Sequence, residues 1–172
     1  MGGLGIEMTT SEKSLLSYLE DCERKAQLVI KDMITAFGEQ CVARVRDRSA
    51  QESWIDHTGN LRSSIGYSVL VDGKELERGG FKSTSAPEGN GSTGRSDGQK
   101  FIEKIIRLYH DNYVLVIVAG MSYADEVEAI ESKDVLASTE SWAREKWSRF
   151  LPELKKRLDK EFQLLEKKHR LS

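Results

Sequence analysis

Apolar residues recur every three or four positions near the start of the chain, which predicts one long amphipathic helix over residues 10–48. Thr9 and Glu12 have the spacing of a capping box, so the start of this helix is chemically defined. Gly38 is its weak point, because glycine costs about 1 kcal/mol relative to alanine inside a helix. A break near Gly38, giving two ordinary helices, stays open as an alternative. The apolar stripe consists of Leu15, Leu19, Cys22, Ala26, Val29, Met33, Phe37 and Cys41.

The length of this helix bears on function. Unbroken, it would measure about 58 Å at a rise of ~1.5 Å per residue. A compact domain of this chain length is only about 40 Å across. The helix would therefore extend beyond its own domain, and its apolar stripe would need a cover from elsewhere. This favours a subunit of an assembly.

Two further stretches have the pattern of strands. From Ile65 to Val71 apolar residues alternate with smaller or polar ones, which is typical of a half-buried strand. Asp72-Gly73 then predicts a hairpin turn, with a second strand from about Lys74 to Gly80. The continuous β-branched run Tyr113–Ala119 suits a central strand. A short strand is also expected over residues 134–137.

The remaining segments are loops and helices. Residues 82–98 are rich in Ser, Gly and Thr and predict a flexible surface loop. Short helices are expected over residues 101–109 and 123–130. A C-terminal helix is expected over residues 139–170, with Pro152 kinking or dividing it. Trp147 lies on the apolar stripe of that helix and is expected in the core, whereas Trp142 lies off it and is the better interface candidate.

This order of elements predicts the α+β class. We expect a small, mostly antiparallel sheet of three to four strands, packed by a long N-terminal helix and a long C-terminal helix. The length of 172 residues suits a single domain spanning residues 1–172.

Composition excludes several classes of function. The formal net charge of −2 offers no polycationic face, so nucleic acid is not an expected partner. The longest apolar run, Tyr113–Ala119, is much shorter than the ~20 residues of a membrane helix. Cys22 and Cys41 would lie roughly 28 Å apart on one helix, too far for a disulfide, and free thiols fit a reducing compartment.

No residue pattern predicts catalysis or a cofactor. Gly89–Ser96 has the spacing of a phosphate-binding loop with Arg95 in the place of lysine, but no buried strand precedes it. Asp56, His57 and a serine could be named as a triad, although polar loop residues are the simpler interpretation. The histidines His57, His110 and His169 lack the spacing of metal ligands. We therefore expect no enzyme, no metal site and no small-molecule substrate.

Two short motifs resemble a known family. The first is Thr58-Gly59-Asn60-Leu61-Arg62-Ser63-Ser64-Ile65, after the long helix and before the hairpin. The second follows the Tyr113–Ala119 strand and comprises Gly120, Tyr123-Ala124 and Val127-Glu128. Together, in this order, they resemble the neck and tail-completion family of lambda-like tailed phages and prophages, also described as head–tail joining or minor capsid-like proteins.

The resemblance implies a structural virion subunit that joins or completes the head–tail interface, as a ring or multi-subunit assembly. Its partners would be other copies of itself and other phage neck or tail proteins. It would be found in the virion and, during assembly, in the cytoplasm of the bacterial host. The alternative is a cytoplasmic helix-mediated binding or regulatory module without a phage role.

The resemblance also implies fold-defining or interface roles for the motif residues. Gly59 would allow a tight turn, and Leu61 and Ile65 would anchor it on the sheet. Arg62 would hold a carboxylate or backbone carbonyls, with Glu128 as a candidate partner. The full set is Thr58, Gly59, Asn60, Leu61, Arg62, Ser64, Ile65, Gly120, Tyr123, Ala124, Val127 and Glu128.

Overall fold

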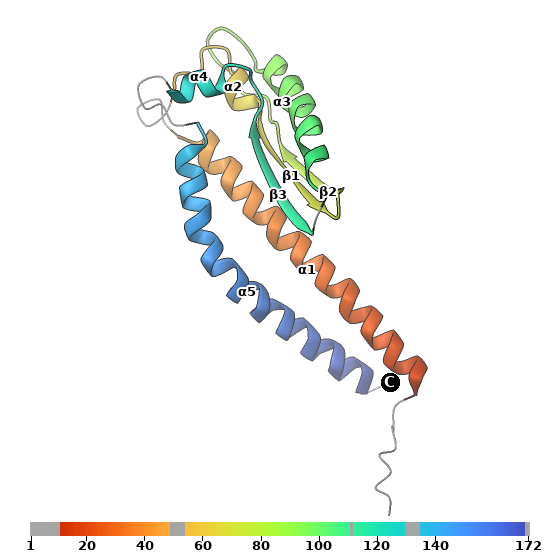
Figure 1. The fold of residues 1–172 in the computed structure, drawn as a ribbon. Coiled ribbons are helices and arrows are strands. Elements are labelled where there is room, and N and C mark those ends of the chain that lie inside the picture. Colours follow the sequence, from red (N-terminus) through yellow and green to blue (C-terminus); the bar gives the residue numbers. More distant parts are fainter. Residues whose placement is uncertain (1–10, 49–53, 111, 130–134, 171–172) are drawn as a thin grey trace, which may run out of the picture. The chain divides into compact units, whose positions relative to one another are not determined.

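The computed structural model describes residues 11–48, 54–110, 112–129 and 135–170, except for the side chains of Glu128 and Arg170. It confirms the α+β class: two long helices and a three-stranded antiparallel sheet (Figure 1). The chain, expected to form one domain, divides into two compact units. Residues 31–149 form the sheet unit, and residues 1–30 with 150–172 form the other, which we call the helix pair.

The first helix, α1 (Glu12–Arg46), is continuous over 35 residues, so the alternative of a break near Gly38 is wrong. Gly38 has a packing role instead. A Cβ atom at this position would lie only 2.7 Å from Cδ2 of Tyr67 and 3.0 Å from Cδ1 of Leu115. The glycine therefore lets α1 approach the sheet closely, at the cost in helix propensity that the sequence shows.

The sheet contains β1 (Ile65–Val71), β2 (Lys74–Gly80) and β3 (Tyr113–Ala119) in the order β2-β1-β3. The predicted hairpin turn is confirmed, since Asp72 and Gly73 both have positive φ, of 47° and 75°. The prediction that Tyr113–Ala119 is the central strand is wrong: β1 is central, and β3 lies at an edge.

Strand β1 is also more buried than its pattern predicts. All its residues except Val71 are buried, including Gly66 and Ser68. A Cβ atom at Gly66 would overlap the ring of Phe81, so this small residue is covered rather than exposed. Because small residues admit a neighbour above them, the alternation of β1 reflects packing size and not exposure to water.

A buried core lies between the sheet and the helix that follows the hairpin in the chain. Helix α3 (Ser92–Ile105) continues into the 3₁₀ helix η1 (Ile106–Leu108). The prediction of a flexible loop over residues 82–98 is therefore wrong from Ser92 onward. The buried core cluster consists of Leu70, Phe81, Ile102, Val116 and Val118.

The remaining helices are α2 (Asn60–Ser63), α4 (Ala124–Ala129) and α5 (Ala137–Arg170). Helix α5 runs through Pro152 without being divided. The predicted strand over residues 134–137 is wrong, because α5 already begins at Ala137; residue 134 itself lies outside the described residues. The roles expected of two tryptophans are reversed: Trp147 is 42% exposed, while Trp142 is half-buried and stacks on Phe37.

Candidate functional sites

The first motif joins the start of α3 to the centre of the sheet unit. Gly59 has a left-handed backbone with φ of 74°, as its place in a tight turn requires. Its carbonyl oxygen accepts hydrogen bonds from the Ser63 hydroxyl at 2.6 Å and the Ser63 N–H at 3.1 Å. The Asn60 side-chain oxygen accepts the Gly94 N–H at 3.0 Å, which satisfies an amide in the first turn of α3.

The end of the first motif meets the start of the second. The Gly120 N–H lies 3.2 Å from the carbonyl oxygen and 3.1 Å from the hydroxyl of Ser64. Leu61 and Ile65 are buried, as their anchoring role implies. Tyr123 lies beside the same region: burial raises its pKa, the Asp56 carboxylate adds to the increase, and the Thr58 hydroxyl opposes it. The two motifs therefore form one contact region in the fold.

Arg62 links this region to the end of α1. Its guanidinium donates to the carbonyl oxygens of Arg46 and, at 3.4 Å, Trp54, and it lies 4.9 Å from the centre of the Trp54 ring. A cation is favourable there because the last carbonyls of a helix lack partners and carry partial negative charge. Backbone carbonyls were among the partners expected of Arg62. The other candidate, the Glu128 side chain, lies outside the described residues.

Within the second motif, Ala124 is buried on α4, and Val127 on α4 and Tyr123 just before it are half-buried. The Val127 N–H donates to the Tyr123 carbonyl at 3.0 Å, so both lie on one turn of the helix. Ser64 and Gly120 thus join the two motifs, while Asn60 and Arg62 bond to groups outside them. This geometry suits residues that define the fold, and it does not provide a catalytic arrangement.

The stretch Gly89–Ser96 has no free phosphate-binding turn. Helix α3 does begin within it, as in a true phosphate loop, but its first amides already have partners. The Gly91 N–H donates to the Thr58 carbonyl at 3.1 Å, and the Ser92 N–H to the Asn90 side chain at 3.1 Å. A Cβ atom at Gly94 would overlap the Asn60 backbone. Protein groups therefore occupy the space that a phosphate would need.

The described ranges lack metal-binding clusters and membrane-spanning helices. They contain no cluster of three or more His, Cys, Asp or Glu residues able to hold a metal ion. No helix in this part of the chain is both long and apolar enough to cross a bilayer. His57 lies at the surface, with its Nδ1 3.6 Å from Glu88 Oε1.

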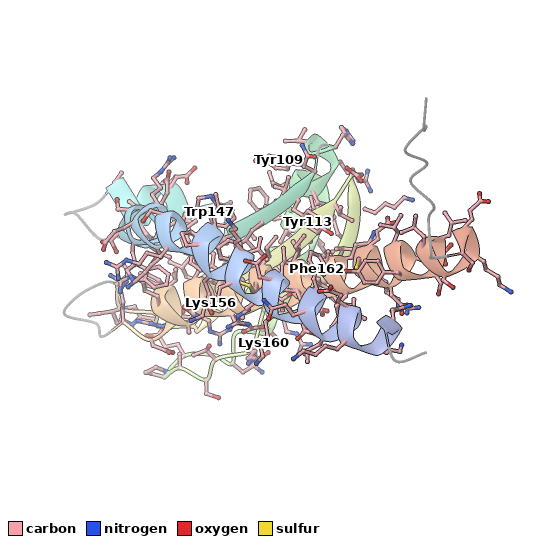
Figure 2. All side chains as sticks on the ribbon, turned by 90° about the horizontal axis from the view of Figure 1, so that it is seen from below. Tyr109, Tyr113, Trp147, Lys156, Lys160 and Phe162 are labelled. Carbon is pink, nitrogen blue, oxygen red and sulfur yellow. The ribbon has the colours of Figure 1, made fainter. Side chains whose placement is uncertain are left out.

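The helix pair is the second candidate site, and polar contacts join α1 and α5 within it. Lys25 Nζ lies 3.1 Å from Glu161 Oε2, and His169 Nε2 lies 3.1 Å from Asp21 Oδ2. Tyr18 meets the His169 ring edge-on at 5.3 Å between centres. The hydrogen bond from His169, assisted by Lys168 and Arg24, holds the pKa of Asp21 below its usual range. Figure 2 labels Lys156, Lys160 and Phe162 along this part of α5.

Burial in the helix pair is low. Within residues 12–30 and 151–169 the structure shows no buried residue. Leu16, Leu19 and Leu164 are each more than half exposed, at 54%, 53% and 52%. Leu15 and Leu19 belong to the stripe that the sequence predicts as apolar, so α5 does not cover this end of the stripe. The contact with α5 therefore leaves these leucines exposed.

Comparison with known proteins adds no relative: no family model matches the chain, and neither a curated protein nor a solved structure matches it. The site is therefore interpreted from its geometry. Sequence reasoning identified the stripe but missed the pairing of Asp21 with His169. These residues are 148 positions apart, and neither has a local pattern that points to the other.

Proposed function

We propose that this chain is a structural subunit of a tailed-phage or prophage particle that joins or completes the head–tail interface. In this proposal it works as one member of a ring or other multi-subunit assembly. It binds further copies of itself and other neck or tail proteins. It needs no cofactor and catalyses no reaction.

The observation that carries the assembly role is the exposure of leucines on the helix pair. Burying a leucine side chain contributes about 1.5–3 kcal/mol, and Leu16 and Leu19 are both more than half exposed on one turn of α1. Neighbouring exposed leucines on one helical turn favour a site where another protein binds. The helix pair is therefore the proposed binding surface.

The phage context rests on the two motifs. Their order around the hairpin and β3 resembles that of the neck and tail-completion family. Asn60, Arg62 and Ser64 form hydrogen bonds within the fold. These contacts support the fold-defining roles that the resemblance implies. A structural subunit needs such residues to hold its shape while its helices bind neighbours.

A double substitution tests the binding surface. We expect Leu16→Gln with Leu19→Gln to lower the mass of the assembly, because two apolar side chains leave the helix-pair interface, while the unfolding midpoint stays within a few degrees. Lys13→Gln with Glu20→Gln is the matched control, since both residues are exposed on the same turns of α1. Light scattering measures the mass. Equal masses for the double variant, the control and the wild type would contradict the proposal.

The phage context needs its own experiment. Immunogold electron microscopy of particles released by the host should place the chain at the head–tail junction. Its absence from particles, together with a fixed small oligomer in solution, would favour the alternative of a helix-mediated binding or regulatory module. The exposed leucines of the helix pair are equally compatible with that alternative.

A further inference from the structure

The two edges of the sheet have different chemistry. On β2, Glu75 and Arg78 form an ion pair at 2.7 Å, and Arg78 also reaches Glu103 at 3.2 Å. Glu77 pairs with Lys31 at 3.0 Å. Strand β3, with the sequence YVLVIVA, carries no charged residue. Natural sheets protect free edges with charges, prolines and bulges, and β2 has charges where β3 has none of these devices.

The outward groups of β3 follow from its pairing with β1. The Gly120 N–H donates to the Ser64 carbonyl, and the Asp72 N–H donates to the Asn112 carbonyl. These bonds fix the phase of the antiparallel ladder, so the even-numbered residues of β3 bond to β1. The backbone groups of the odd-numbered residues point away from β1. In the described residues no hydrogen bond reaches these outward groups of Tyr113, Leu115, Ile117 and Ala119.

The space beside this edge is hollow, with both apolar and charged residues along it. A cavity of about 520 Å³ lies along Leu115, Val116 and Ile117, between η1 and the start of α5. A second of about 510 Å³ adjoins Tyr113 and Trp147, both labelled in Figure 2. The ion pair between Glu140 and Arg144 borders the first cavity and carries no net charge. The side chains of an added strand would have room on this side.

We infer that the β3 edge binds the β3 edge of a second copy, antiparallel, to form one sheet across both subunits. This inference deepens the proposed function, on which it rests for the premise that copies assemble. Outward N–H and C=O groups at alternate residues are matched by another extended strand and by no other common element. The uncharged sequence makes β3 compatible with itself, because no like charges face each other in any register.

Side-chain chemistry also favours one register for the pairing of the two β3 strands. With the two-fold axis at Val116, Leu115 of one copy lies opposite Ile117 of the other, and both are outward-bonding residues. This places aliphatic side chains in direct cross-strand pairs, which stabilise a sheet. Pairing β3 with the β2 edge would instead set Glu75, Glu77 and Arg78 against an uncharged strand. The chemistry of the edges thus favours a symmetric contact between identical strands.

Amide hydrogen exchange by NMR tests this contact in the unmodified protein. We expect the amides of Leu115 and Ile117 to gain at least tenfold protection as protein concentration rises into the associated range. The amides of Val116 and Val118 bond to β1 and should stay protected throughout. Unchanged exchange at Leu115 and Ile117 in the associated protein would overturn the inference, as would full protection of these amides in the monomer.

Variants separate this contact from the helix pair. Ile117→Lys should abolish the concentration-dependent protection, whereas Leu76→Lys, on the already charged β2 edge, should retain it. If Ile117→Lys does not fold, the exchange result in the wild type still decides. Leu16→Gln with Leu19→Gln should leave the β3 protection in place, so failure of the helix-pair proposal is distinguishable from failure of this one. Equal protection in Ile117→Lys and wild type would overturn the β3 contact.

Discussion

The sheet unit and the helix pair are parts of one chain, but they differ in how far their apolar residues are buried. In the sheet unit, residues such as Ile65, Val69 and Ile102 are fully buried between β-strands and helices. In the helix pair, the described residues 12–30 and 151–169 include none that is buried. Helices α1 and α5 run through both. The comparison shows that the same helix can be buried in a core at one end and remain exposed at the other.

The largest effect should come from disturbing the sheet unit at the contact of α3 with the first motif. Gly94→Val should destabilise the fold by about 3 kcal/mol or more, because a side chain there overlaps the Asn60 backbone. Urea unfolding followed by circular dichroism measures this change. Thr93→Val, at the exposed neighbouring position, is the control and should change stability by less than about 0.5 kcal/mol. Similar values for both would contradict the packing assigned to Gly94.

The two cysteines should differ in reactivity according to the unit that holds them. Cys41 lies in the sheet unit, is fully buried, and burial raises the pKa of its thiol to about 11. An increase of about two units leaves roughly a hundredfold less thiolate at neutral pH. Cys22, in the helix pair, is only half-buried. Iodoacetamide labelling followed by mass spectrometry should therefore modify Cys22 first, and faster labelling of Cys41 would contradict the comparison.

Gly38 gives a prediction in which helix propensity and packing oppose each other. Gly38→Ala should destabilise the protein by about 1–2 kcal/mol, since the new Cβ meets the Tyr67 ring, although alanine favours helix. The exposed residue Ala36 provides the reverse control: Ala36→Gly should cost about 1 kcal/mol through propensity alone. Thermal unfolding measures both. Stabilisation by Gly38→Ala would mean that α1 does not need the close approach to β1.

The smallest effect concerns the pH dependence of the helix pair. The folded pKa of Asp21 is lowered, so its contribution is present above its unfolded pKa and is lost as pH falls through the folded value. The protection factors of amides in residues 12–30, taken relative to intrinsic exchange at each pH, should therefore fall at acidic pH. Asp21→Asn should remove this dependence, because an amide does not titrate. Identical acid profiles for wild type and Asp21→Asn would show that Asp21 does not hold the pair together.

Much of the fold was predictable because it depends on local pattern. The long helix, the hairpin at Asp72-Gly73 and β3 follow from periodicity and turn chemistry. Helix α3 was predicted only from Phe101 onward, because it begins on glycines and small polar residues whose packing depends on Asn60, distant in the sequence. The edge position of β3 was not predictable either, since a continuous apolar run is equally compatible with a covered central strand.

The candidate site divides in the same way. The stripe is a local pattern: Leu15 and Leu19 are exposed, whereas Cys22, Ala26 and Val29 are half-buried in the helix pair. The contacts of Asn60 with Gly94 and of Ser64 with Gly120 join distant segments, so the motif letters alone did not define them. Which backbone groups of β3 point away from β1 could be derived only from the register of the two strands.

The helix pair and the β3 edge should bind partners, whereas the core of the sheet unit is already buried. This expectation is tested by the mass of the wild-type protein in solution, measured by light scattering over a wide concentration series. We expect a mass that rises with concentration toward a defined oligomer. A strict monomer at the highest concentration would contradict self-assembly, because both the exposed leucines and the β3 edge would then remain uncovered.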